Sequence, residues 1–269
     1  METQIISKFK NASLVNNERS KIGFLKDGPK ITRYTLADAV HEPDHRMDYN
    51  IQTITQADRE KVLNFLRKFF FRDEPLNHCI GLIPEGENST CIELEDYSMS
   101  AMSEDFSFMA VTANGSVIGV ILNGSMGPIS KEEPHYIVNC ANPKFKKILK
   151  LLYCVEKNSN IPEKFPDQKV LEIRIISVDS KWRGKGIAKA LFEKTMEVAK
   201  NRGFDIIRVD CSSAITGKLC QRLSFEPVFE LKYADYVDEA GNPIFKPAPP
   251  HEAEVTYVKK VPQSVKVSN

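Results

Sequence analysis

The 269-residue sequence predicts an α/β protein with a mixed β-sheet flanked by helices. Two observations carry this prediction. The segment "FSFMAVTANGSVIGVILNG" (residues 106–124) places two β-prone apolar runs around a turn, which is typical of an antiparallel hairpin. In the second half of the chain, a strand, a helix and another strand follow one another, which is typical of a β-α-β unit. The complete expected order is β-α-(α)-β-β-α-β-α-β-α-β-β.

Composition excludes several classes of protein. With 42% hydrophobic and 27% charged residues, the chain has the profile of a soluble globular protein. A formal net charge of +1 gives no basis for general nucleic-acid binding. No apolar run approaches a membrane span, and the N-terminal sequence lacks the apolar core and cleavage site of a signal peptide. We therefore expect a cytoplasmic protein that binds neither nucleic acid nor membrane.

The six cysteines and five histidines predict neither disulfides nor a metal centre. No two cysteines have C-x-x-C spacing, and cytoplasmic thiols are normally reduced. The histidines do not pair with the cysteines at zinc-ligand spacing, so we expect no bound metal.

Three regions are expected along the chain. Residues 1–48 are polar and show no sustained hydrophobic period, which predicts a flexible N-terminal arm. Residues 49–262 contain the expected helices and strands and form one domain. Residues 263–269 form a C-terminal tail.

The domain begins with a short strand around Ile51, followed by a helix. Thr55 suits the N-cap of this helix, with Asp58 in the capping-box position. Apolar residues then recur at helical spacing. We expect the helix to end near Glu74, because Pro75 disfavours a helical conformation at the preceding residue.

The middle of the chain predicts the hairpin, a helix and a central strand. Asn114-Gly115 suits a type I′ turn, in which both central residues take positive φ. Residues 143–157 form an amphipathic helix with an apolar face of Phe145, Ile148, Leu149, Leu152 and Val155. The strand at residues 169–178 has a nearly continuous apolar C-terminal half, which predicts a buried central position.

The remaining elements complete the sheet. A helix is predicted from Ile187 to Gly203, which suits its C-terminal end. The last elements are a strand at 205–212, a short helix at 214–225, and strands at 226–236 and 251–261.

Between the central strand and the helix at Ile187 lies the run Arg183-Gly184-Lys185-Gly186, which can bind an anion. The first helical turn leaves backbone N–H groups unpaired, and the helix dipole favours negative charge there. Glycines let the backbone approach a bulky pyrophosphate, and the basic side chains add positive charge. The alternative is a glycine-containing turn with solvated basic residues.

Three phosphate-binding patterns compete for this run. The P-loop pattern G-x-x-x-x-G-K-[ST] is absent, and the dinucleotide fingerprint would need glycine or alanine where Lys189 stands. The third pattern, [QR]-x-x-G-x-[GA], is completed by Arg183, Gly186 and Ala188. It resembles the pyrophosphate loop of the GCN5-related N-acetyltransferases (GNAT), which bind acetyl-CoA. Their fold implies splayed parallel strands at the centre of the sheet.

Several further segments, in chain order, resemble the insect arylalkylamine N-acetyltransferases over residues from about 50 to about 260. They are "FFFRDEPLN", "VIGVILNG", "NPKFKKIL", "ISVDSKWRGKGIA", "VDCSS" and "YADY…FKPAPPH". The resemblance implies direct transfer of an acyl group, usually acetyl, from CoA to a primary amine such as dopamine, serotonin, tyramine or octopamine. We expect acetyl-CoA and a small amine as ligands, and a monomer.

The resemblance also implies catalytic residues. An arylalkylamine is protonated at neutral pH and must lose a proton before it attacks a thioester. Glu74 matches the family's general base, and its neighbours Pro75 and three phenylalanines favour desolvation and a raised pKa. The alternative is a solvated carboxylate at a helix end. Ser212 matches the first of two serines of the insect enzymes that relay protons or stabilise the thiolate, and Thr216 stands at the second position, where it keeps a hydroxyl. Helix capping is the alternative for both. Ser213 is expected to be a plain cap.

The other implied site residues fall into two groups. Acetyl-CoA is expected along Ile176, Ser177 and Val178, with its pyrophosphate on Arg183, Gly184, Lys185, Gly186, Ile187 and Ala188. The substrate pocket is expected to include Phe70, Asp73, Pro75, Met126 and Glu172. His251 is expected to anchor the Pro-rich loop near the site.

The chain departs from other relatives in two places. Glu172 and Arg174 stand where vertebrate relatives have two histidines, and Cys220 lies in the region where many GNAT enzymes have a tyrosine acid. Two alternatives within the family are a polyamine or agmatine acceptor and a longer acyl donor. An alternative of a different class is a silent CoA-binding module, against which the presence of Glu74 argues.

Overall fold

The computed structural model describes residues 49–86 and 89–262, so the predicted arm (1–48) and tail (263–269) lie outside the described residues. A seven-stranded sheet has the order β1-β2-β3-β4-β5-β7-β6. β4 and β5 are parallel, and the other neighbouring pairs are antiparallel, which confirms the predicted mixed sheet. The strands are β1 (Tyr49–Thr53), β2 (Phe108–Thr112), β3 (Val117–Ser125), β4 (Val170–Val178), β5 (Ile206–Cys211), β6 (Glu226–Lys232) and β7 (Ala253–Lys260).

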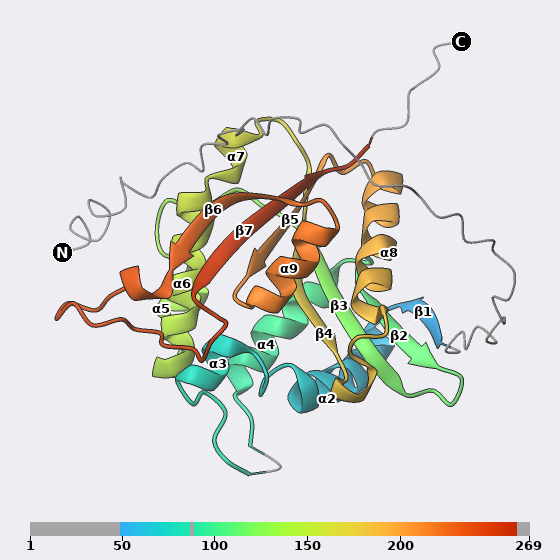
Figure 1. The fold of residues 1–269 in the computed structure, drawn as a ribbon, viewed down its shortest axis with the longest axis horizontal. Helices are drawn as coiled ribbons and strands as arrows, with labels where there is room; N and C mark the ends of the chain where they lie inside the picture. Colours follow the sequence, from blue (N-terminus) through green and yellow to red (C-terminus); the bar gives the residue numbers. More distant parts are fainter. Residues whose placement is uncertain (1–48, 87–88, 263–269) are drawn as a thin grey trace, which may run out of the picture. The chain divides into compact units, whose positions relative to one another are not determined.

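Helices cover both faces of this sheet (Figure 1). On one face lie α8 (Ile187–Asn201) and α9 (Ala214–Arg222), and on the other lie α2 (Arg59–Phe69) and α6 (Pro143–Ser159). None of the helices within the described residues is both long and apolar enough to cross a membrane.

Four further α-helices complete the described fold, and the element order expected from the sequence included at most one of them. They are α3 (Pro75–Cys79), α4 (Ile92–Ser100), α5 (His135–Val138) and α7 (Ile161–Lys164). Helices of four or five residues are too short to show a hydrophobic period of 3.6 residues, and α4 alternates apolar with acidic positions. Pattern analysis therefore misses them.

The first helical segment begins as its sequence predicts. The N–H and the hydroxyl of Thr55 both donate to the Asp58 carboxylate, at 3.0 and 2.8 Å. The segment starts with a 3₁₀ turn, Gln56–Asp58, before α2 begins. The α2 helix ends at Phe69, five residues before Glu74.

The two parallel strands diverge, as expected. Pairing between β4 and β5 runs from Val170 opposite Ile206 to Ile173 opposite Val209, and then stops. The β4 strand continues to Val178, held only by β3 on its other edge. The central strands are therefore splayed toward the C-terminal end of β4.

The hairpin between β2 and β3 is confirmed, but its predicted type I′ turn is wrong. Thr112 N–H donates to the Ser116 carbonyl at 3.0 Å, and Gly115 N–H donates to the Thr112 carbonyl at 2.8 Å. Gly115 has φ of +82°, whereas Asn114 is not left-handed. A bulge between Ala110 and Val111 lengthens the connection to three residues, and such a loop needs only one left-handed residue.

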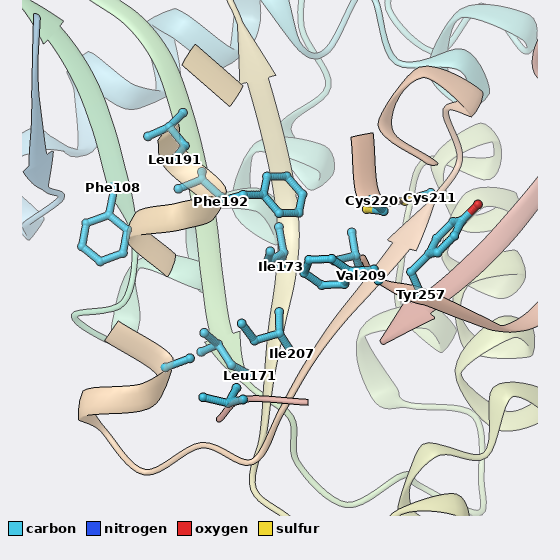
Figure 2. Packing of buried hydrophobic residues seen from close by; sticks show 14 of the residues in the cluster. Phe108, Leu171, Ile173, Leu191, Phe192, Ile207, Val209, Cys211, Cys220 and Tyr257 are labelled. Atoms are coloured by element: carbon cyan, nitrogen blue, oxygen red, sulfur yellow. Dashed lines mark hydrogen bonds between the residues drawn. The ribbon is translucent and has the colours of Figure 1, made fainter. Parts of the chain in front are cut away.

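The two faces of the sheet differ in chemistry. Toward α8, apolar side chains from several strands form the core, in which Phe192 of α8 lies beside Ile173 of β4 (Figure 2). The alternate residues of the same strands point the other way. On that opposite face the strands present charged side chains: Glu172 and Arg174 from β4, Arg208 and Asp210 from β5, and Glu254 from β7.

Close packing of α8 on β3 requires glycine at position 119. A Cβ there would lie 2.8 Å from Cγ2 of Ile187 and 3.2 Å from Cδ1 of Leu191. Because both neighbours are buried, we expect Gly119→Ala to lower the free energy of unfolding by about 1–3 kcal/mol in urea titrations.

Gly127→Ala is the matched control for this loss, since a Cβ at Gly127 meets nothing within 4 Å. Equal urea midpoints for the two variants would show that α8 does not depend on the small residue at Gly119.

Candidate active site

A cavity of about 730 Å³ lies over the charged face of the sheet. The strands β4, β5 and β7 form its floor, and α3, α4, α5 and α6 form its walls. Its described lining contains seven acidic side chains and two arginines, and this surplus of acidic groups favours a cationic ligand. These residues are Glu74, Glu93, Asp96, Glu156, Glu172, Asp210 and Glu254, with Arg174 and Arg208.

Glu74 lies where the turn after α2 meets α3. Its backbone is extended, with ψ of 126°, as the following Pro75 favours. Oε2 accepts a hydrogen bond from Asn77 N–H at 2.6 Å and so caps α3. Oε1 is buried and has no hydrogen-bond partner within the described residues. Burial raises the pKa of the Glu74 carboxyl, and the N–H groups of Asn77 and Leu76 and the Ser212 hydroxyl only partly offset this. The carboxylate is not the solvated group of the alternative reading.

The turn after β5 brings a hydroxyl to the same cavity. Ser212 lines the cavity. Ser213 is the N-cap of α9, as predicted, because its Oγ accepts from Ile215 N–H at 3.3 Å. Thr216 lies in the first turn of α9 and is not part of the cavity lining. The structure therefore brings Ser212, but not Thr216, toward Glu74.

A buried arginine organises the floor of the cavity. Arg208 has no exposed surface, and its guanidinium lies 3.3 Å from Glu172, 2.5 Å from Asp210 and 3.7 Å from Sδ of Met126. Burial opposes its charge, but the carboxylates of Asp210, Glu172 and Glu156 outweigh burial and raise the pKa of Arg208.

Sequence reasoning missed Arg208 and Asp210, although a signal was present. Both lie in the run "IIRVDC", two positions apart in an otherwise apolar strand. Charged residues at that spacing share one face, and buried charges need partners. The pattern therefore indicates a charged cluster, while its partners come from other strands and cannot be read from the run itself.

Three of the five predicted substrate residues line the cavity, namely Phe70, Met126 and Glu172. Glu172 also pairs with Arg174 at 3.1 Å. The other two predicted residues do not line the cavity: Pro75 is buried at the start of α3, and Asp73 pairs with Arg183 instead.

Two aromatic side chains in the cavity wall were not predicted. Tyr97 of α4 and Tyr136 of α5 have ring centroids 6.1 Å apart, and Tyr97 meets Phe145 of α6 edge-on at 5.8 Å. Together with Phe70 they give the acidic cavity an aromatic wall.

The loop before α8 leaves the start of that helix open. Gly184 and Gly186 have φ of +75° and +82°, a conformation that disfavours other residues. Gly186 is the N-cap and provides no side-chain hydrogen bond to the N–H groups of the first turn, which begins at Ile187 and Ala188. A Cβ at either glycine would meet nothing within 4 Å, so the space beside the loop is free for a ligand.

Arg183 and Lys185 add positive charge to this loop. Nε of Arg183 donates to the Val178 carbonyl at 3.1 Å, and Nη2 pairs with Asp73. Lys185 lies over the ring of Trp182, with Nζ 4.9 Å from the centroid. Arg183 thus connects the end of β4, the glycine loop and the turn after α2.

Ile176, Ser177 and Val178 form the end of β4 beyond its pairing with β5. One edge of this stretch pairs with β3. The other edge has no strand partner, because pairing with β5 stops at Ile173. Unpaired backbone groups on a strand edge can hydrogen-bond an extended ligand.

Comparison with known proteins places this arrangement in a family. A family model described as "Acetyltransferase (GNAT) family" matches residues 82–217, half of the chain. This range contains the hairpin, β4, the glycine loop, α8 and β5. The chain belongs to the GNAT acetyltransferase family.

Solved GNAT structures agree with this assignment. Arylalkylamine N-acetyltransferase 2 from Aedes aegypti is 36% identical, with a TM-score of 0.75, over 80% of this chain and 99% of that one. Mosquito arylalkylamine N-acetyltransferase like 5b is 26% identical, with a TM-score of 0.69, over 79% and 100%. An agmatine N-acetyltransferase is 25% identical, with a TM-score of 0.68, over 79% and 99%.

GNAT acetyltransferases use acetyl-CoA as a co-substrate. The open helix start at Gly186 and the unpaired edge of β4 fit the pyrophosphate and the extended arm of such a molecule. Within residues 49–86 and 89–262, no cluster of three or more His, Cys, Asp or Glu could hold a metal ion.

The buried Glu74 carboxylate makes this GNAT domain less stable as pH rises. Because the folded state raises the pKa of Glu74, the folded protein binds more protons between the unfolded and folded pKa values. The free energy of unfolding therefore falls as pH rises through that window. Glu74→Gln keeps an acceptor for Asn77 but does not titrate, so we expect it to be more stable than wild type at about pH 8 and not at about pH 4.

Urea titrations at both pH values measure this difference. Glu226→Gln on β6 removes an exposed carboxylate outside the cavity and controls for the loss of one charge. A Glu74→Gln difference that is equal at the two pH values would show that folding does not raise the pKa of Glu74.

Proposed function

We propose that this GNAT N-acetyltransferase acetylates arylalkylamines, the class that includes dopamine, serotonin, tyramine and octopamine, with Glu74 as the general base. The observation that carries the proposal is the buried, unpartnered Oε1 of Glu74 at an acidic cavity with an aromatic wall. The 36% identity to a mosquito arylalkylamine N-acetyltransferase supports the same substrate class.

The proposed reaction uses two proton transfers. Glu74 takes one proton from the substrate ammonium, which frees the nitrogen lone pair. The nitrogen attacks the thioester carbonyl carbon, a C–N bond forms, and the C–S bond breaks as the tetrahedral intermediate collapses. The second nitrogen proton passes to the departing CoA thiolate, with the Ser212 hydroxyl as the relay beside Glu74. Thr216 is assigned no step, since it is not part of the cavity lining.

The proposed acetyl-CoA site lies where β4 and β5 separate. The pantetheine arm lies against the unpaired edge of β4 at residues 176–178. The pyrophosphate lies on the loop of residues 183–188, where uncapped N–H groups, Arg183 and Lys185 offset its charge. The acetyl group then lies between the splayed strands, on the cavity side.

The proposed acceptor site combines charge with aromatic surface. The excess of carboxylates favours a protonated amine, and Phe70, Tyr97 and Tyr136 suit a planar ring. Glu172 and Arg174 at the floor can hydrogen-bond ring hydroxyls of a catechol or phenol.

A second candidate acceptor is agmatine or a polyamine. Glu156 and Glu172 in the lining could hold a second cationic group, away from Glu74. Burial raises the pKa of Glu156, which weakens that attraction. We therefore rank agmatine second, although an agmatine N-acetyltransferase is among the similar structures. The monomeric state and the cytoplasmic location stay predictions.

Steady-state assays with acetyl-CoA test the acceptor and the base. We expect dopamine, serotonin and tyramine to be acetylated with a higher kcat/KM than agmatine. Glu74→Ala should lower kcat/KM at neutral pH by about 100- to 10,000-fold, the range of a lost general base. Its residual rate should rise with pH, because solution then supplies the free amine.

Glu193→Gln on α8, an exposed carboxylate outside the cavity, is the control variant. Turnover of agmatine with all aromatic amines inert would replace the first acceptor class by the second. An unchanged pH profile in Glu74→Ala would remove Glu74 from the mechanism. If the protein binds acetyl-CoA but acetylates no amine, it is a silent CoA-binding module and not an enzyme. If it prefers a longer acyl-CoA to acetyl-CoA, the proposed acetyl donor is wrong.

Substitution of Arg183 tests the proposed acetyl-CoA site independently of the amine site. Removing a charge-assisted contact to phosphate should raise KM for acetyl-CoA by about 10-fold in Arg183→Ala, and kcat should change by less than about 2-fold. Lys189→Ala is the control, because Lys189 is a basic residue of α8 that follows the loop and pairs only with Glu193 at 3.7 Å within the described residues. An unchanged KM for acetyl-CoA would place the pyrophosphate elsewhere.

A further inference from the structure

A buried tyrosine lies between two oxygen atoms that both need its proton. Oη of Tyr233 lies 3.0 Å from the carbonyl oxygen of Ser212 and 3.2 Å from Oε2 of Glu254. Tyr233 and Glu254 are only 2% and 1% exposed. A phenol has one proton to donate, and a carbonyl oxygen can only accept. The two contacts are therefore both hydrogen bonds only if Glu254 supplies a second proton.

Only one arrangement of protons satisfies all three groups. If Glu254 were ionised, Tyr233 could donate to one oxygen and would face the other without a proton between them. If Glu254 is protonated, it donates to Oη of Tyr233, which in turn donates to the Ser212 carbonyl. Buried polar groups in folded proteins are almost always paired, so the second arrangement is favoured.

The groups that surround Glu254 favour the same protonation state. Burial raises the pKa of Glu254 well above its usual range, and the carboxylates of Asp210 on β5 and Glu74 before α3 raise it further. A hydrogen bond donated by Tyr233 would lower the pKa of Glu254, and Arg208 lowers it as well. However, the single proton of Tyr233 is shared with the Ser212 carbonyl, and the Arg208 guanidinium is engaged by Asp210 and Glu172. The Cys211 thiol and the Tyr233 phenol, also nearby, have raised pKa values themselves and stay neutral.

The same network holds the turn that carries Ser212. Tyr233 holds the Ser212 carbonyl, and Nδ1 of His251 accepts a hydrogen bond from Ala214 N–H at 3.2 Å. Burial lowers the pKa of His251, which keeps Nδ1 free to accept. The two contacts come from the segments that flank the Pro-rich loop, in line with the anchor predicted for His251.

The geometry points to Glu254 as a protonated positioning residue that acts through Tyr233 to hold Ser212 beside the base. This inference rests on the proposed function, in which Ser212 works next to Glu74. It also assigns different states to two carboxyl groups of one cavity. Glu254 holds its proton and adds no negative charge beside Glu74, so Glu74 is the carboxyl that takes the substrate proton.

Substitutions separate this role from a structural one. Glu254→Gln keeps a donor for Tyr233, so its kcat should stay within about 3-fold of wild type. Glu254→Ala and Tyr233→Phe should lower kcat by about 10- to 100-fold, with KM for acetyl-CoA unchanged, because Ser212 is no longer held. Tyr257→Phe is the control, because Tyr257 lies on β7, as Glu254 does, and its hydroxyl accepts a hydrogen bond from Gln221 of α9 outside the cavity. Equal kcat in Tyr233→Phe and Tyr257→Phe would overturn the inference.

The protonation state is measured in two ways. The acid limb of the kcat/KM profile should be the same in wild type and Glu254→Gln. If Glu254 is anionic, its replacement removes a negative charge beside Glu74 and shifts that limb to lower pH, which would overturn the inference. The infrared difference spectrum of the two proteins at neutral pH should contain the carbonyl band of a protonated carboxyl group. This measurement needs no substrate, so it tests Glu254 even if no amine is acetylated.

Discussion

The divergence of β4 from β5 after Ile173 is the constraint on which the rest of the site depends. While two parallel strands stay paired, their backbone groups satisfy each other. Once they separate, the edge of β4 has no partner in the sheet, and the elements that follow the two strands begin apart. The glycine loop and α8 follow β4, and the turn with Ser212 follows β5. In the proposed binding mode, the pyrophosphate of acetyl-CoA lies at the start of α8, and its acetyl group lies on the side of the cavity that Ser212 lines.

The parts of the fold that the sequence predicted are those with long periodic patterns. The α6 and α8 helices and the buried β4 strand each carry such a pattern over nine or more residues. The glycine loop was predictable because its spacing reflects a local requirement, an uncapped helix start with a left-handed backbone. The turn type of the hairpin was not predictable from the sequence, because a bulge in β2 changed the loop length. Bulges depend on pairing between strands.

The candidate site was predicted less completely, for a different physical reason. Glu74, Phe70 and Ser212 could be named through resemblance, and they line one cavity. The buried cluster around Arg208 could not be predicted from the sequence. Its members come from β4, β5 and β7, and only the register of the strands brings them together. Each carboxylate in isolation reads as a surface residue. The sheet places them on one face, and the opposite face holds the apolar core.

The surplus of carboxylates over arginines in the cavity also affects what happens after acetyl transfer. The substrate enters as a cation, whereas the acetamide that leaves is neutral. The electrostatic attraction that favours a cationic amine in this cavity therefore does not hold the amide. The charge that favours entry thus does nothing to slow product release. In such a cavity the reaction weakens its own product's binding, and no movement of the protein is needed to achieve this.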